Sequence, residues 1–118
     1  MSEDKSPNPP VPEVTFDEFK RIEIRVAKVV EASRVPNSSK LVKLILDIGG
    51  DKKQCIAGLG AVYSPEKLLD KLIAVVMNLK PRILMGLVSE VMLLAAGDGP
   101  EISVLTLDKP IGTGARVT

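Results

Sequence analysis

Short stretches with strand patterning, separated by glycine, proline and polar turn residues, recur along most of this chain. In the first of them, Ile22, Ile24 and Val26 alternate with Glu23 and Arg25, which is the period-two pattern of a strand with one buried face. Further strands are predicted at residues 41–48, 53–59, 72–77, 88–96 and 102–107. Five or six short strands with turns between them indicate an all-β fold that closes into a small barrel.

Two short helices are predicted among the strands. Thr15 can cap the first, and Glu18 completes a capping box three residues later. Val14 and Phe19 then occupy the positions of a hydrophobic staple, so the helix is expected to place Phe16 and Phe19 against the sheet.

The second helix is predicted between the third and fourth strands. Ser64 stands at its cap position, and Pro65 occupies its first turn. A helix inserted at this point suits a five-stranded OB-fold with a C-terminal strand extension, although periodicity alone does not separate that fold from other small barrels. Lys28 interrupts the apolar face of the first strand, so a bend is expected there.

The length of 118 residues suits one domain. Residues 1–12 contain four prolines among charged and polar residues, and are predicted to form a disordered arm before a folded domain at 13–118. The longest apolar runs, 72–77 and 91–96, fall far short of the roughly 20 residues that a membrane helix needs. No signal-peptide pattern is present, and we expect a soluble, cytoplasmic protein.

The side chains that most enzymes use are scarce. Histidine is absent, which excludes Ser-His and Cys-His nucleophilic pairs and the commonest metal ligand. Cys55 is the sole cysteine and is expected to be a small core residue. The glycine pairs 58/60 and 112/114 lack the third glycine of a dinucleotide-binding loop. A carboxylate pair stays open from sequence, but we expect no catalytic, cofactor or metal site.

Charge is unevenly distributed along the chain. Residues 1–19 carry a net charge of −4, whereas residues 20–53 hold nine basic side chains against four acidic ones. Such a segment fits either an anion-binding surface or an ordinary solvated face. Only two Phe and one Tyr are present, so a nucleic acid would be held through phosphates, sugar hydroxyls and shape rather than by base stacking.

Four sequence stretches, in order, carry a family resemblance. They are Glu23–Val29, Pro36–Leu41, Tyr63–Glu66, and Asn78–Arg82 with Gly86, Ser89 and Met92–Ala96 following. Together they resemble the tRNA-binding domain family, which includes the C-terminal module or separate β subunit of methionyl-tRNA synthetase, structure-specific tRNA-binding proteins and a secretion-related chaperone.

The resemblance implies an OB-fold, a homodimer, and sequence-tolerant binding of the tRNA body without catalysis. A methionyl-tRNA synthetase catalytic subunit would be a partner, to which this chain would be at most an accessory β subunit. The implied RNA-facing residues are Asn37, Lys40, Asn78, Lys80, Arg82 and Ser89. The apolar segments 83–88 and 102–117 are candidates for the dimer interface, because the mean hydropathy of +0.19 is high for so small a domain.

The sequence also departs from the family pattern. Ile83 and Met85 stand where many members have basic residues, and Val91 replaces a common glycine. The first two changes make the implied RNA face more apolar. They leave open the alternative of a peptide-binding chaperone on the same scaffold.

Overall fold

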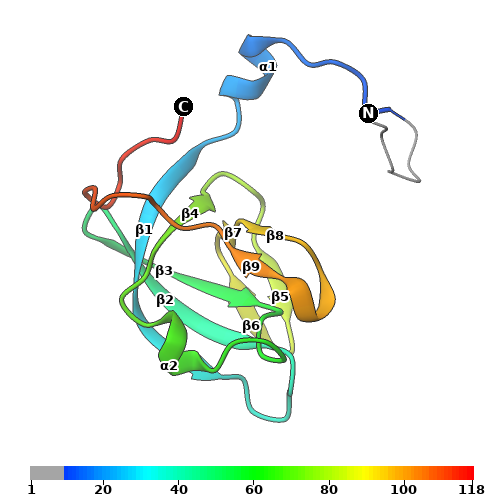
Figure 1. Cartoon of the computed structure of the whole chain (residues 1–118), viewed down its shortest axis with the longest axis vertical. Helices are drawn as coiled ribbons and strands as arrows, with labels where there is room; N and C mark the ends of the chain where they lie inside the picture. The colour runs from blue at the N-terminus through cyan, green and yellow to red at the C-terminus, as the bar shows by residue number, and fades with distance from the viewer. Residues whose placement is uncertain (1–9) are drawn as a thin grey trace.

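The structure, a computed structural model, describes residues 10–118, so most of the predicted arm at 1–12 lies outside the described residues. The elements are α1 (Phe16–Lys20), β1 (Ile24–Arg34), β2 (Val42–Ile48), β3 (Asp51–Ala57), α2 (Pro65–Leu68), β4 (Leu72–Val76), β5 (Arg82–Leu84), β6 (Leu87–Ser89), β7 (Met92–Leu93), β8 (Ala95–Ala96), the 3-10 turn η1 (Gly99–Glu101) and β9 (Ser103–Val104). Figure 1 shows their arrangement.

An antiparallel sheet with the order β3-β2-β1-β4-β7 forms the body of the molecule. β1 is long enough to serve two neighbours, because residues 24–28 pair with β4 and residues 28–34 pair with β2. A register shift between Val29 and Glu31 lets the strand turn from one neighbour to the other. The bend expected near Lys28 is thereby confirmed.

The two ends of the sheet are joined by hydrogen bonds between β3 and the residues before β7. The Gln54 N–H donates to Glu90 Oε1 at 2.8 Å, and the Glu90 N–H donates to the Gln54 carbonyl at 2.8 Å. The Ile56 N–H donates to Ser89 Oγ at 3.0 Å. The sheet is therefore curled on itself, and the predicted all-β, OB-like fold is confirmed.

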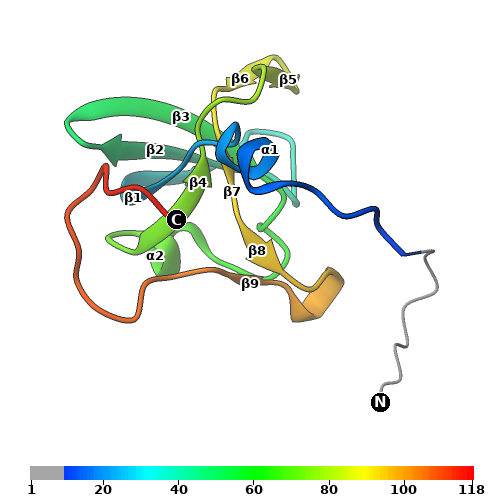
Figure 2. The same ribbon diagram turned by 90° about the horizontal axis from the view of Figure 1, so that it is seen from above.

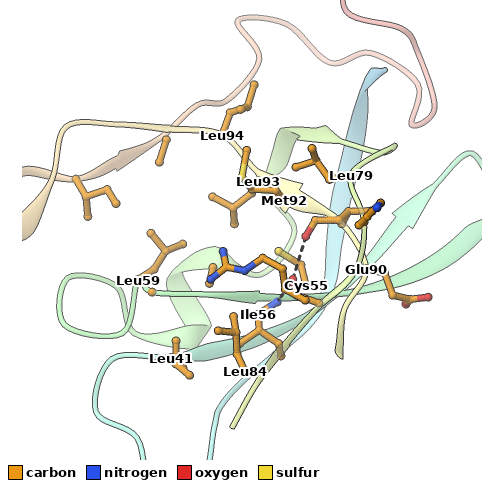
Figure 3. A pocket seen from close by; sticks show the side chains of 18 residues that line it. Leu41, Cys55, Ile56, Leu59, Leu79, Leu84, Glu90, Met92, Leu93 and Leu94 are labelled. Atoms are coloured by element: carbon orange, nitrogen blue, oxygen red, sulfur yellow. Dashed lines mark hydrogen bonds between the residues drawn. The ribbon is translucent and has the colours of Figure 1, made fainter. Parts of the chain in front are cut away.

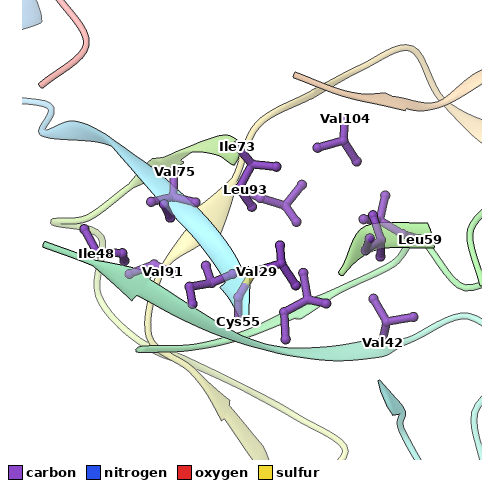
Figure 4. Packing of buried hydrophobic residues seen from close by; sticks show 14 residues of the cluster. Val29, Val42, Ile48, Cys55, Leu59, Ile73, Val75, Val91, Leu93 and Val104 are labelled. Atoms are coloured by element: carbon purple, nitrogen blue, oxygen red, sulfur yellow. The ribbon is translucent and has the colours of Figure 1, made fainter. Parts of the chain in front are cut away.

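The core fills the inside of the curled sheet. Residues of β2 alternate strictly, with Val42, Leu44, Leu46 and Ile48 buried and the residues between them partly exposed. All four belong to one buried cluster with residues of the other strands, and Figure 4 shows Val42 and Ile48 within it. Cys55 is 1% exposed within this cluster, as its assignment to the core predicted.

α1 begins as predicted but does not pack as predicted. The Glu18 N–H donates to Thr15 Oγ1 at 3.0 Å and the Thr15 N–H donates to Glu18 Oε1 at 2.7 Å, which completes the capping box. The helix buries none of its residues, however, and Phe16 and Phe19 are 72% and 41% exposed. The expected contact of these rings with the sheet is wrong, because α1 stands beyond the end of β1, away from the sheet (Figure 1).

The later strands differ most from the predicted ones. The single strand predicted at 88–96 is divided among β6, β7 and β8, because Ser89–Val91 turns aside to bond with β3. The segment 78–86, where no strand is predicted, contains β5, which pairs with β6 as a hairpin. Figure 2 shows this hairpin projecting from the body of the molecule.

The C-terminal segment extends the sheet, as predicted. Between residues 114 and 117 it runs antiparallel to the start of β1: the Gly114 N–H donates to the Val26 carbonyl at 2.7 Å and the Val117 N–H to the Ile24 carbonyl at 2.8 Å. Within residues 10–118, no helix has the length and apolar character required to cross a membrane.

Candidate nucleic-acid interface

A cavity of about 540 Å³ lies between β3 and the segment 79–95. Its wall is mostly aliphatic, and Figure 3 shows Leu59, Leu84, Leu93 and Leu94 around it. Leu41 also lines it, which brings the loop between β1 and β2 to the same opening. The cavity has the size and the apolar character of many ligand sites.

Two cations stand on the wall of this apolar cavity. Lys80 and Arg82 both line it and both are exposed. Pro81 separates them, and its ring restricts the backbone that presents both charges. Over residues 10–118, neither cation has a carboxylate partner within salt-bridge distance. Both charges are therefore available to an anionic ligand.

The loop between β1 and β2 carries Asn37 and Lys40. The Ser38 N–H donates to the Val35 carbonyl at 3.2 Å, which closes a four-residue turn, and Asn37 has φ +65° at its third position. That conformation favours glycine or asparagine and suits proline at the second position, which Pro36 occupies. Asn37 is thus explained by the turn. Lys40 is exposed and next to the cavity-lining Leu41, and within residues 10–118 no carboxylate lies within salt-bridge distance of it.

Ser89 is placed inside the protein. It is 9% exposed, and its hydroxyl donates to the Val91 carbonyl at 3.0 Å while accepting the Ile56 N–H at 3.0 Å. Both hydrogen bonds stabilise the junction of β3 with the segment before β7. Ser89 also lines the cavity, so its predicted RNA-facing position corresponds to a nearly buried hydroxyl in the cavity wall.

Asn78 is also engaged within the protein. Its Oδ1 accepts the Glu23 N–H at 2.8 Å, and its Nδ2 donates to the Arg21 carbonyl at 2.6 Å. The side chain therefore ties the connection between α1 and β1 to the end of β4. Of the six predicted site residues, Lys40, Lys80 and Arg82 are cations at or beside the cavity that have no carboxylate partner in the described part of the chain. The other three, Asn37, Asn78 and Ser89, have structural roles.

The sequence does not assign the apolar residues Leu79 and Met92 to the site. Leu79 and Met92 line the cavity although they are 46% and 44% exposed. Ile83 and Val88 pair across the β5–β6 hairpin and are 73% and 43% exposed. A hairpin turn of Asn-Gly would have revealed these strands, but the turn here is Met85-Gly86.

Cys55 contributes no reactive group to the cavity that it lines. Burial raises the pKa of its thiol, and hydrogen bonds with the Leu93 backbone and the Ser89 side chain only partly oppose that effect. A thiol held in its neutral form is a weak nucleophile and a weak metal ligand. In the described part of the chain, no group of three His, Cys, Asp or Glu residues could hold a metal ion.

Known proteins share this sequence and this fold. The family model described as "Putative tRNA binding domain" matches residues 24–116. A methionine–tRNA ligase of Thermotoga maritima is 50% identical over 105 residues, which are 89% of this chain and 17% of that protein. One from Methanococcus aeolicus is 45% identical over 104 residues, or 88% of this chain and 15% of that protein. The chain thus spans about a sixth of the length of these relatives.

Solved structures agree with the sequence comparison. A MetRS-related protein from Pyrococcus horikoshii superposes with a TM-score of 0.86 at 29% identity, covering 92% of this chain and all of that chain. The chaperone CsaA from Bacillus anthracis superposes with a TM-score of 0.82 at 25% identity, covering 91% and 100%. Because the family model spans nearly the whole described domain, the chain belongs to the tRNA-binding domain family.

Proposed function

We propose that this protein binds the body of tRNA in the cytoplasm without catalysing a reaction, and that it acts in trans with a methionyl-tRNA synthetase. The observation that carries the proposal is the pair Lys80 and Arg82, both exposed and both on the wall of one cavity. Lys40, beside that cavity, adds a third cation. Point charges on a restricted backbone suit phosphates, whose position in a folded RNA depends on shape more than on sequence.

In this proposal, the remaining three residues of the predicted site hold the structure around the cations. Ser89 holds the wall of the cavity, Asn37 sets the turn that precedes Lys40, and Asn78 fixes the start of the loop that carries Lys80. The chemistry of aminoacylation would belong to the synthetase, to which this chain would add binding energy for the tRNA.

The active form in this proposal is a homodimer that uses α1. The helix exposes Phe16 and Phe19, and the residues flanking it expose Val14 and Ile22. Hydrogen bonds from Asn78 and Arg116 hold its C-terminal end. A helix that exposes two aromatic rings and is held in place without burying a residue is suited to a partner surface. A second copy offers the same surface by two-fold symmetry. This interface differs from the segments 83–88 and 102–117 that sequence reasoning favoured.

The test is tRNA binding measured by fluorescence anisotropy over a range of salt concentrations. Replacement of Lys80 and Arg82 together by alanine should weaken the binding of every tRNA by a similar factor. Each single replacement should lower the salt slope by about 1, because each lost phosphate contact releases about one counterion fewer. A matched control is Lys67→Ala on α2, an exposed cation that does not line the cavity. An unchanged affinity and salt slope in the double variant would contradict the proposal.

A second candidate function rests on the apolar character of the same cavity. An aliphatic wall, the exposed Ile83, Met85 and Val88 on the adjoining hairpin, and the similarity to two CsaA chaperone structures suit the binding of unfolded peptide. Peptide binding in an apolar groove should respond little to salt, whereas tRNA binding should weaken steeply. Competition between tRNA and an unfolded apolar peptide in the same titration separates the two functions.

A further inference from the structure

We infer that Asn78 couples dimerisation to RNA binding, and that it does so without touching RNA. The inference rests on the proposed function, since it concerns the same cations and the same helix. It departs from the role that the family resemblance implies for this residue, which is a direct contact with RNA.

The first observation is the pair of hydrogen bonds that Asn78 makes across 57 and 55 residues of sequence. Its amide group binds both the Arg21 carbonyl (2.6 Å) and the Glu23 N–H (2.8 Å), the two backbone groups on either side of Ile22. The Met77 N–H also donates to the Glu23 carbonyl at 2.7 Å. Asn78 therefore sets the direction in which the chain leaves β1 toward α1, which has no core packing of its own to set it.

The second observation is that the surface under α1 and the cationic cavity share a wall. A second cavity of about 540 Å³ lies between the end of α1 and the end of β4, and Ile22 and Asn78 line it. Leu79 and Met92 line both this cavity and the one that carries Lys80 and Arg82. A side chain of a second copy that fills the α1 cavity would press on Leu79, the residue immediately before Lys80.

These observations connect Asn78 both with dimerisation through α1 and with RNA binding by Lys80 and Arg82. Its side chain holds the proposed dimer helix, and its backbone begins the loop of Lys80-Pro81-Arg82. A dimer that fixes α1 would also fix this loop, so that less conformational entropy is lost when the cations meet phosphates. By thermodynamic reciprocity, tRNA should then strengthen dimerisation by the same factor by which dimerisation strengthens tRNA binding.

The test compares Asn78→Ala and Asn78→Asp with the wild type in the full chain. Asparagine to aspartate keeps an oxygen for the Glu23 N–H but removes the donor to the Arg21 carbonyl. Loss of one or two such hydrogen bonds should weaken dimerisation by about tenfold, measured by analytical ultracentrifugation without RNA. Binding to tRNA should weaken with it, whereas the salt slope of the remaining binding should stay unchanged because no phosphate contact is lost.

A double-mutant cycle with Phe19→Ser separates coupling from direct contact. If Asn78 acts through α1, Asn78→Ala should have no further effect on tRNA binding once Phe19→Ser has already made the protein monomeric. If Asn78 touches RNA, its replacement should weaken tRNA binding by the same factor in both backgrounds, and the inference would be overturned. A tandem fusion of two Asn78→Ala copies should recover most of the lost tRNA affinity, since the linker replaces the weakened association.

Failure of the inference and failure of the proposed function give different results. Wild-type protein that binds no tRNA would remove the proposed function, and the ultracentrifugation of Asn78→Ala would still decide whether Asn78 holds the dimer. Wild-type protein that binds tRNA while Asn78→Ala dimerises normally would overturn the inference alone. Lys80→Ala is the matched control, because it should weaken tRNA binding and leave dimerisation unchanged.

Discussion

Three polar residues of the candidate RNA-binding site have structural roles within the protein. Ser89, Asn78 and Asn37 all belong to motifs that suggest RNA contact, and each makes a hydrogen bond or adopts a backbone conformation that the fold requires. Loss of tRNA binding on replacing such a residue would not by itself show contact. Stability and salt dependence must be measured together to separate the two roles.

Replacement of Ser89 by alanine should lower the free energy of unfolding by about 1–3 kcal/mol, because the buried Ile56 N–H and Val91 carbonyl both lose their partner. Urea denaturation measures this effect. The salt slope of tRNA binding should not change. Ser64→Ala is the control, since Ser64 makes no side-chain capping hydrogen bond and its loss should have little effect. A stable Ser89→Ala variant with a reduced salt slope would instead favour a direct RNA contact.

Met85 is held in a conformation that its side chain disfavours. It has φ +48° and precedes Gly86 at φ +79°, so the two form a hairpin turn whose first position suits asparagine. Met85→Asn should raise the free energy of unfolding by about 1 kcal/mol, because asparagine tolerates the left-handed region better than methionine. Thermal denaturation measures the gain. Ile83→Asn, an equally polar change in the adjacent strand, should give no gain, and equal effects of the two variants would contradict the strain argument.

At the scale of elements, the sequence predicts strands well where one face is buried in the core and poorly where the chain leaves the core. β2 and β4 were placed within a residue or two, because their apolar residues are all required by one interior. The β5–β6 hairpin was missed, since Ile83 and Val88 face outward and follow no inside-outside alternation. α1 was predicted from its capping box, which is local, but its lack of contact with the sheet depends on tertiary geometry that no local signal contains.

The candidate site likewise contains some residues that the sequence predicts and others that it does not. Lys40, Lys80 and Arg82 could be selected as cations of recognisable motifs, and none of them forms an ion pair with any residue from 10 to 118. The aliphatic wall could not be predicted, because it is assembled from β3, the 79–84 segment and β7, which are distant in sequence. The hydrogen bonds of Asn78 likewise join residues 55 and 57 positions apart, a separation at which sequence periodicity carries no information.

The C-terminal segment depends on a close approach of two glycines. Gly114 has φ +90°, and a Cβ atom added to it would lie 3.0 Å from Gly49 Cα. Gly114→Ala should therefore lower the free energy of unfolding by roughly 2 kcal/mol and loosen residues 114–117 from β1. Hydrogen exchange of the backbone amides at positions 114 and 117 would report this loosening. Gly112→Ala is the matched control: a Cβ there meets nothing within 4 Å, so its stability should stay the same or rise slightly. Equal stability of the two variants would contradict this account.

At the scale of the whole molecule, the exposed apolar residues and the lack of core packing of α1 require a common explanation. Phe16, Phe19 and Ile22 are each more than 40% exposed, whereas the side chains inside the sheet are almost completely buried. The domain therefore has a well-packed core and, separately, an apolar surface that its own fold does not cover. A second copy of the chain covers that surface in the proposed homodimer.

If the homodimer forms through α1, the thermal stability of the protein should depend on its concentration, because association stabilises the folded state by mass action. The Tm should rise measurably over a hundredfold increase in concentration, while light scattering gives the mass of two chains. Replacement of Phe16 and Phe19 by serine should abolish the concentration dependence and halve the mass. It should leave the Tm at low concentration nearly unchanged, since neither ring belongs to the core. Leu69→Ser is the control, because Leu69 is 44% exposed but lies beside α2, and its replacement should leave the dimer intact. A monomeric wild type whose Tm does not depend on concentration would contradict a homodimer formed through α1.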